Sequence, residues 1–191
     1  MVSSARLLPP RPAAPAVLLS CLLAAAQGMG ADPERFDLGR TPTAAEINGV
    51  DIDVMPDGRG LPAGEGSVPR GEEIYQSACA HCHGSTGQGG AGGSLTGAPL
   101  YSPAELAADP SLLRTVGNYW PYATSLFDYI RRAMPFDRLG SLTDDEVYAV
   151  TAYLLYLNGL VERSVVVDGD TLSRVEMPAR RYFKPASQME R

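Results

Sequence analysis

The stretch Cys79-Ala80-His81-Cys82-His83 restricts the fold of this 191-residue chain more than any other segment. Its two thiols stand three residues apart, and the imidazole of His83 follows directly. A structural disulfide or a zinc site also uses close cysteines, but the chain has no second cysteine pair, and its only other histidine is His81. A thioredoxin-like pair begins a helix after a strand, whereas this pair ends a helical pattern. The pattern therefore favours a haem that both thiols bind covalently while His83 ligates the iron.

The iron of such a haem needs a second axial ligand, and no histidine outside the pentapeptide is left to supply it. A methionine thioether is the natural candidate. Met134-Pro135 lies 51 residues after His83 between two helical patterns, so its loop can cover the opposite haem face. Met177-Pro178 is the chief rival, because it repeats the same dipeptide. The methionines considered are Met55, Met134, Met177 and Met189.

Ligation by His83 and Met134 leaves no open position on the iron. It also raises the reduction potential of the haem relative to ligation by two nitrogen atoms. This arrangement favours electron transfer over a peroxidase-like reaction, which needs a displaceable ligand and a distal acid-base group. Trp120 and Tyr122 are candidates to donate hydrogen bonds to the haem propionates. The candidates to pair with the propionate charge are Arg114, Arg131 and Arg132.

Helical patterns surround the pentapeptide on both sides. Ser67 can cap a helix that begins at Val68 and runs to the cysteine pair. After the pair, the glycine-rich residues 84–97 predict a loop whose backbone can lie close to a flat group. Capping signals at Ser102 and at Asp109-Pro110 then predict two short helices.

Two longer helices complete the predicted core. The first begins after Trp120-Pro121 and ends before Met134-Pro135, because a proline cannot continue a helix and biases its predecessor out of it. The second begins at the capping box Thr143–Glu146 and stops at Asn158-Gly159, a pair suited to a left-handed helix end. Together these elements predict one haem domain over residues 68–158.

The segments that flank this domain predict irregular arms. Residues 27–67 are rich in Gly, Pro and Asp and have poor periodicity. Residues 159–191 also look irregular, apart from a run of three valines, Val165–Val167, that suits a short strand. The chain has neither an internal repeat nor a second Cys-x-x-Cys-His, so we expect a single haem.

Residues 1–26 have the pattern of a cleaved secretory signal, in which Arg6 and Arg11 precede the apolar run Ala13–Ala26. The run is about 14 residues long, whereas a membrane-spanning helix needs roughly 20, so we expect no membrane span in the mature chain. Removal of this leader lowers the net charge from −6 to −8, which argues against a nucleic-acid partner. We expect a periplasmic protein, where covalent attachment prevents loss of the haem.

The order of these elements resembles the class I cytochrome c family. A helix, Cys-x-x-Cys-His, a glycine-rich loop, Met-Pro and a capped final helix follow one another over residues 68–158. The resemblance implies an all-α fold that carries haem c with its edge partly exposed to redox partners.

A closer resemblance covers about residues 36 to 185 and involves the cytochrome subunit of bacterial sulfite and sulfane dehydrogenases. In that family the cytochrome pairs with a molybdenum-cofactor subunit, which oxidises the sulfur compound and hands over its electrons singly. The segments that carry the resemblance are Leu38–Thr41, Asp51–Val54, Gly60–Gly64, Asn118–Thr124, Phe127–Pro135 and Asp145–Ala149.

Carried onto this sequence, the resemblance implies that Cys79 and Cys82 bind haem c and that His83 and Met134 ligate its iron. It also implies that the chain is no enzyme on its own, but the electron-transfer subunit of an oxidoreductase complex that passes electrons to a downstream cytochrome c or oxidase. The alternative is a freely diffusing periplasmic cytochrome c that serves another dehydrogenase or a terminal oxidase. For such a shuttle, the two arms would be dispensable.

Overall fold

The computed structural model describes residues 38–184. The expected secretory signal, the beginning of the N-terminal arm and Met189 lie outside these residues. Contacts within the chain divide it after Pro42, and every element described below lies in the unit that begins at Thr43. In chain order the elements are α1 (Ala44–Val50), β1 (Glu65–Ser67), α2 (Val68–Ala78), α3 (Ala80–His83), α4 (Pro103–Ala108), α5 (Val116–Tyr119), α6 (Ala123–Ala133), α7 (Asp144–Leu157), β2 (Val166–Asp168), α8 (Gly169–Ser173) and the 3-10 helix η1 (Pro178–Tyr182).

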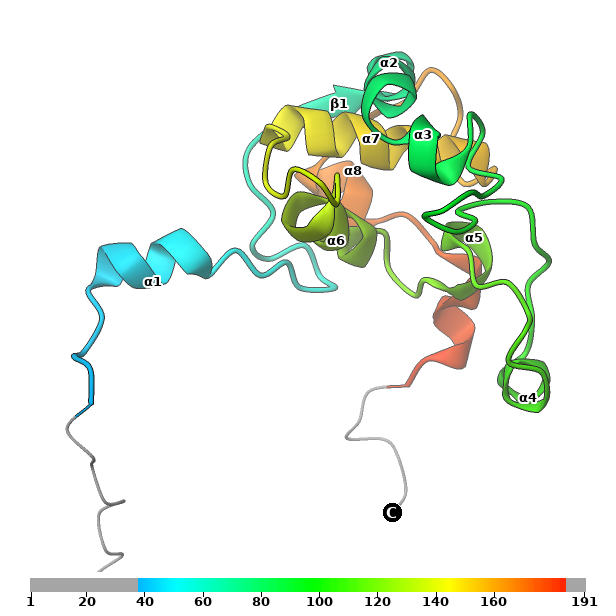
Figure 1. The fold of residues 1–191 in the computed structure, drawn as a ribbon, viewed down its shortest axis with the longest axis horizontal. Coiled ribbons are helices and arrows are strands. Elements are labelled where there is room, and N and C mark those ends of the chain that lie inside the picture. Colours follow the sequence, from blue (N-terminus) through cyan, green and yellow to red (C-terminus); the bar gives the residue numbers. More distant parts are fainter. Residues whose placement is uncertain (1–37, 185–191) are drawn as a thin grey trace, which may run out of the picture. The chain divides into compact units, whose positions relative to one another are not determined.

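Helices α2 and α7 pack against each other and form the centre of the core (Figure 1). They approach closely because Gly71 has no side chain: a Cβ atom there would lie 1.8 Å from the carbonyl oxygen of Ala149. The rings of Tyr75 and Tyr153 meet at the same interface, with centroids 5.3 Å apart. Since α7 buries every residue from Val147 to Leu155, it has the character of a central helix with neighbours on all sides.

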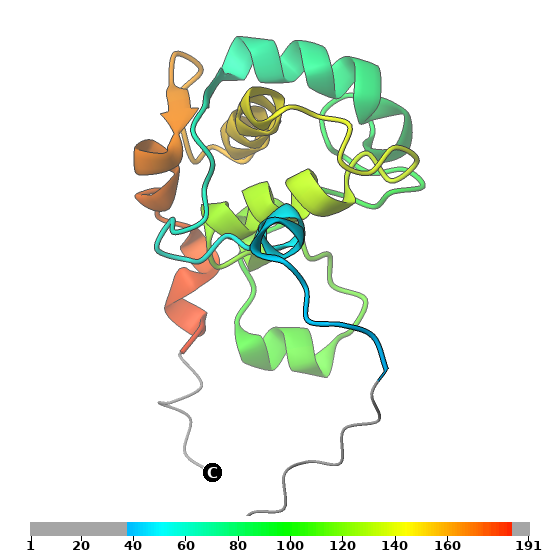
Figure 2. The same ribbon diagram turned by 90° about the vertical axis from the view of Figure 1, so that its left-hand side faces the viewer.

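Helix α6 packs on the side of α7 opposite to α2, so that α7 lies between them (Figure 2). The ring of Phe127 on α6 lies 4.4 Å from that of Tyr148 on α7. Leu126 and Ile130 are buried on the same face of α6. This arrangement confirms the expected all-α core.

The ends of the core helices follow the capping signals of the sequence. The Ser67 hydroxyl accepts the Arg70 N–H at the start of α2, and Thr143 and Glu146 form the expected capping box at the start of α7. Helix α6 ends before Met134, whose backbone is extended. Beyond α7, Gly159 adopts the left-handed conformation, with a φ of 69°.

The prediction of a helix that starts at Asp109-Pro110 is wrong. Residues 109–112 form a turn instead, in which the Asp109 carboxylate accepts hydrogen bonds from the N–H and the hydroxyl of Ser111. An aspartate that holds the backbone two residues ahead stabilises a turn as readily as a helix start. The next helix, α5, begins only after Thr115.

Two short strands connect the segments that flank the helical core. Strand β1 pairs antiparallel with β2, with Gly66 opposite Val167. Gly66 also lies so close to α7 that a Cβ atom would sit 2.0 Å from the Ala149 nitrogen. The valine run therefore forms the expected short strand, and both arms contain ordered elements. In contrast, α1 buries none of its residues. Within residues 38–184, no helix is long and apolar enough to cross a membrane.

Candidate haem site

The Cys-x-x-Cys-His pentapeptide lies at a break between two helices. The N–H of Cys79 donates to the Tyr75 carbonyl at the end of α2, and the N–H of His83 donates to the Cys79 carbonyl in the short helix α3. The second helix thus starts afresh at the first cysteine. Its single turn holds both thiols and the imidazole within five residues.

The ring of His83 is fixed by the glycine-rich loop. Its Nδ1 atom lies 3.0 Å from the carbonyl oxygen of Gly93. Because a carbonyl only accepts hydrogen bonds, Nδ1 carries the proton and Nε2 keeps a lone pair for a metal ion. The loop reaches this position because Gly92 has no side chain: a Cβ atom there would lie 2.6 Å from the His83 ring. The glycine-rich loop therefore lies close to a flat group, as expected, and that group is the imidazole of His83.

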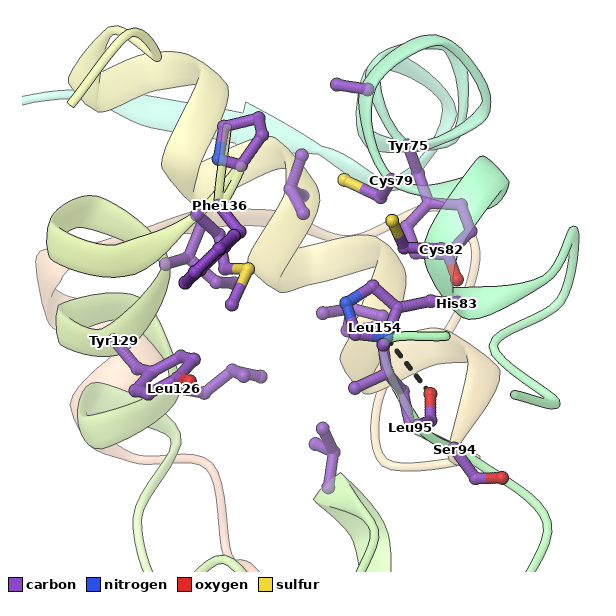
Figure 3. Close-up of a pocket in the computed structure, with 18 of the residues that line it drawn as sticks. Tyr75, Cys79, Cys82, His83, Ser94, Leu95, Leu126, Tyr129, Phe136 and Leu154 are labelled. Carbon is purple, nitrogen blue, oxygen red and sulfur yellow. Dashed lines mark hydrogen bonds between the residues drawn. The ribbon is translucent and has the colours of Figure 1, made fainter. Parts of the chain in front are cut away.

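A cavity of about 800 Å³ opens beside the pentapeptide, and Cys79, Cys82, His83 and Met134 all line it. Figure 3 shows the two cysteines and His83 on one side, with Leu126 and Tyr129 of α6 on the opposite side. The apolar residues of the wall include Ala78, Leu95, Val116, Leu126, Ile130, Leu142, Val150 and Leu154. The structure therefore brings all four predicted site residues to one mostly apolar space.

The methionines occupy different surroundings. Met134 follows the last turn of α6, where its N–H donates to the Ile130 carbonyl, and its side chain lines the cavity. Met177 is buried in the hydrophobic core with 3% of its surface exposed, and it does not line the cavity. Met55 is 43% exposed and is likewise absent from the cavity wall. Among the described methionines, the geometry favours Met134.

Burial controls the ionisation of the groups next to the cavity. It raises the pKa of the Cys79 thiol to about 11, and the neighbouring Cys82 adds to this rise. Burial also raises the pKa of Tyr75 to about 12. Tyr75 is therefore a neutral phenol that donates a hydrogen bond to the Gly84 carbonyl, 2.9 Å away, and so ties α2 to the residue after His83.

The residues predicted to bind the haem propionates fall into two groups. Arg114 and Trp120 line the cavity, whereas Tyr122, Arg131 and Arg132 do not. Arg131 pairs with Asp144 at 3.0 Å. Arg132 pairs with Asp128 and Asp53. Only the first group is placed to meet a ligand in the cavity.

Asn158 is a residue of this site whose role the sequence did not indicate. Its side-chain nitrogen donates to the carbonyls of Leu95 and Leu154, and its oxygen accepts the N–H of Gly117. One amide thus holds three segments that each contribute an apolar residue to the cavity wall. The sequence marks Asn158 only as a helix end, because nothing in it shows which distant backbone groups an amide will meet.

The residues present fit a covalently bound haem. Two thiols, an imidazole with a free Nε2 and a thioether are the donors that such a group requires, and they share one cavity. The close contact of Gly92 with the His83 ring provides a backbone support for the imidazole. A helical domain with this set of side chains has the features of a c-type cytochrome.

Comparisons with known proteins also indicate a cytochrome c. Residues 66–154 match the family model described as cytochrome c oxidase, cbb3-type, subunit III. A chain in the crystal structure of the sulfane dehydrogenase SoxCD from Paracoccus pantotrophus is 37% identical, with a TM-score of 0.69, and the match covers 81% of this chain and 74% of that one.

Two curated relatives are thiosulfate dehydrogenases, one from Stutzerimonas stutzeri and one from Psychrobacter arcticus. Each is 30% identical, over 114 and 93 residues respectively. The matches cover 59% and 49% of this chain but only 33% and 27% of the relatives, so the chain spans a third or less of their length.

The chain belongs to the cytochrome c family, whose members carry haem c. Within that family it is related to a chain of a sulfur dehydrogenase, and its resemblance to sulfane dehydrogenase is thereby confirmed.

Proposed function

We propose that this chain is a monohaem c-type cytochrome that transfers single electrons as a subunit of a sulfur-oxidising dehydrogenase. The observation that carries the proposal is the cavity into which Cys79, Cys82, His83 and Met134 converge. A haem attached there would supply a one-electron couple. The chain would not act as an enzyme on its own.

Each of the four residues has a separate role in the proposal. Cys79 and Cys82 hold the haem through thioether bonds, so that it cannot dissociate after export to the periplasm. His83 would ligate the iron through Nε2, since Nδ1 faces the Gly93 carbonyl. Met134, which also lines the cavity, would supply the second ligand. The mostly apolar wall would restrict access of water and substrate to the iron.

The proposed electron donor is a molybdenum-cofactor sulfite or sulfane dehydrogenase subunit. The identity of 37% to a chain of the SoxCD sulfane dehydrogenase, over 81% of this chain, supports a partner of this type. The match extends beyond the haem domain into the flanking segments, because residues 68–158 alone make up less than half of the chain. The proposed electron acceptor is a downstream cytochrome c or an oxidase.

A catalytic role in thiosulfate oxidation is a second candidate, since both curated relatives are called thiosulfate dehydrogenases. Those proteins are about three to four times as long as the segments that this chain matches. A ligand set of one histidine and one methionine leaves no coordination site for a substrate. We therefore favour electron transfer over catalysis.

Purification of the native protein tests the proposed function. We expect the cytochrome to elute together with a molybdenum-containing subunit, and sulfite or a sulfane compound to reduce its haem only when that subunit is present. The purified chain alone should show no reduction by sulfite or thiosulfate. Elution as a lone cytochrome that the molybdenum subunit does not reduce would favour the freely diffusing shuttle. Reduction of the lone chain by thiosulfate would favour the catalytic role.

A further inference from the structure

Six arginines of residues 38–184 lie against carboxylates, but Arg114, Arg180 and Arg181 are held in a different way. Arg59, Arg70, Arg131, Arg132, Arg138 and Arg163 each have a carboxylate oxygen within 4 Å. Within residues 38–184, no such ion pair is formed by Arg114, Arg180 or Arg181. Their guanidinium groups instead meet neutral oxygens and aromatic rings, so that no carboxylate of residues 38–184 lies within 4 Å of them.

The contacts of Arg114 and Arg180 form a continuous series, and Arg181 follows Arg180 directly in the sequence. Arg114 lies over the ring of Tyr119 at 5.7 Å and donates to the backbone carbonyls of Leu106, Pro110 and Leu112. The ring of Tyr119 meets that of Phe183 edge-on at 6.1 Å. We call this series the arginine–aromatic patch, and its members are Arg114, Tyr119, Tyr122, Arg180, Arg181 and Phe183.

The other end of the patch lies on η1 and the residues after it. Arg180 donates to the Phe183 carbonyl at 2.7 Å and lies over the ring of Tyr122 at 4.8 Å. Arg181 lies over the ring of Tyr182 at 5.0 Å. The segment 174–184 holds four basic residues and one acid, in a chain whose net charge is −6. The patch is therefore a local excess of positive charge on an acidic protein.

The patch begins at the rim of the haem cavity. Arg114 and Trp120 line the cavity, and Trp120 lies between Tyr119 and Tyr122 in the sequence. Helix α5, which carries Tyr119, also packs against η1. A partner that contacts Arg180 and Arg181 would consequently be guided toward the group held by Cys79 and Cys82.

We infer that the arginine–aromatic patch is a docking surface for an acidic face of the molybdenum subunit that donates electrons to this chain. Guanidinium groups fixed on aromatic rings have lost much of their freedom before binding, and their planar shape suits paired hydrogen bonds to carboxylates. Charge beside the point of electron exchange raises the association rate of a partner of opposite charge. The inference rests on the proposed function and adds the chemistry of the partner surface to it.

Electron transfer from the molybdenum subunit to the haem-loaded cytochrome tests this inference. The variant R180Q/R181Q removes two charges of the patch but leaves the cavity residues intact. The control R59Q/R70Q removes two exposed arginines that are paired with Asp57 and Glu73. The second-order rate constant is measured at several salt concentrations, with sulfite as the reductant of the molybdenum subunit. Thermal unfolding followed by circular dichroism checks that both variants fold.

For R180Q/R181Q we expect a rate constant at low salt about fivefold or more below that of the native cytochrome, with a weaker salt dependence. The control also removes two positive charges, but neither Arg59 nor Arg70 lines the cavity, so its rate constant should stay within about twofold of the native value. Equal rates for all three proteins, or equal losses in both variants, would overturn the docking surface while leaving the proposed function standing.

If the molybdenum subunit fails to reduce even the native cytochrome, the proposed function fails. The patch is then tested separately by the rates at which small charged oxidants oxidise the reduced cytochrome. R180Q/R181Q should slow oxidation of the reduced cytochrome by the anion ferricyanide, but not by the cation tris(phenanthroline)cobalt(III). An unchanged ratio of the two rates would overturn the inference. Binding to phosphatidylglycerol vesicles that only R180Q/R181Q loses, with unchanged electron transfer, would overturn it in favour of a membrane surface.

Discussion

His83 shows how a single side chain depends on both its sequence neighbours and a distant loop. The pentapeptide predicts the imidazole as an iron ligand, because two thiols and a histidine at this spacing suit one haem. It does not predict that Nδ1 will face the Gly93 carbonyl, since that contact depends on how the loop folds back. The hydrogen bond selects the nitrogen that is left for a metal.

Replacement of Met134 by alanine tests the second ligand. We expect Met134→Ala to lower the reduction potential and to abolish the absorption band that arises from sulfur bound to ferric iron, because the thioether raises the potential. Redox titration and an absorption spectrum of the ferric protein measure both effects. Met177→Leu serves as the control and should leave the band and the potential unchanged, since Met177 lies in the core away from the cavity. A band that survives in Met134→Ala but is lost in Met177→Leu would reverse this assignment.

The core helices show which elements a sequence can define. Capping boxes and prolines predicted the starts and ends of α2, α6 and α7, because those signals act within one helical turn. The same local rules failed at Asp109-Pro110, where a turn competes with a helix start. The β1–β2 pair joins residues about a hundred positions apart, so no local pattern specified which strand would pair with the valine run.

The close packing of α2 on α7 gives a prediction for these elements. A methyl group at Gly71 would collide with the Ala149 carbonyl, so Gly71→Ala should lower the free energy of unfolding by about 3 kcal/mol. Urea unfolding of the haem-loaded protein measures the change. Gly49→Ala is the matched control, because it adds the same methyl group to α1, where nothing lies within 4 Å. Similar stabilities for the two variants would contradict the proposed tight contact between α2 and α7.

Tyr148, in the second turn of α7, connects the central helix to a segment far away in the sequence. Its hydroxyl donates to the Pro62 carbonyl at 2.9 Å and so anchors the segment before β1 to the central helix. Burial raises the pKa of Tyr148 to about 12, and the nearby Asp144 adds to the rise. The folded state therefore keeps this proton at pH values where the unfolded chain has lost it.

The stability of the protein should consequently fall in alkali. The contribution of Tyr148 is fully present below pH 10, the usual pKa of tyrosine, and is lost as the pH rises toward 12, by roughly 2 kcal/mol. Tyr148→Phe should flatten this decline, at a cost of about 1 kcal/mol near neutral pH for the lost hydrogen bond. Urea unfolding between pH 8 and 12 provides the comparison. An equally steep alkaline decline in the variant would show that Tyr148 does not titrate as described.

The account as a whole depends on a haem that is covalently bound to Cys79 and Cys82. Extraction of the purified native protein with acidified acetone tests this claim most directly. We predict that the red colour stays with the precipitated polypeptide, because thioether bonds survive acid and solvent. Transfer of the colour into the acetone would contradict the covalent attachment and with it the proposed function.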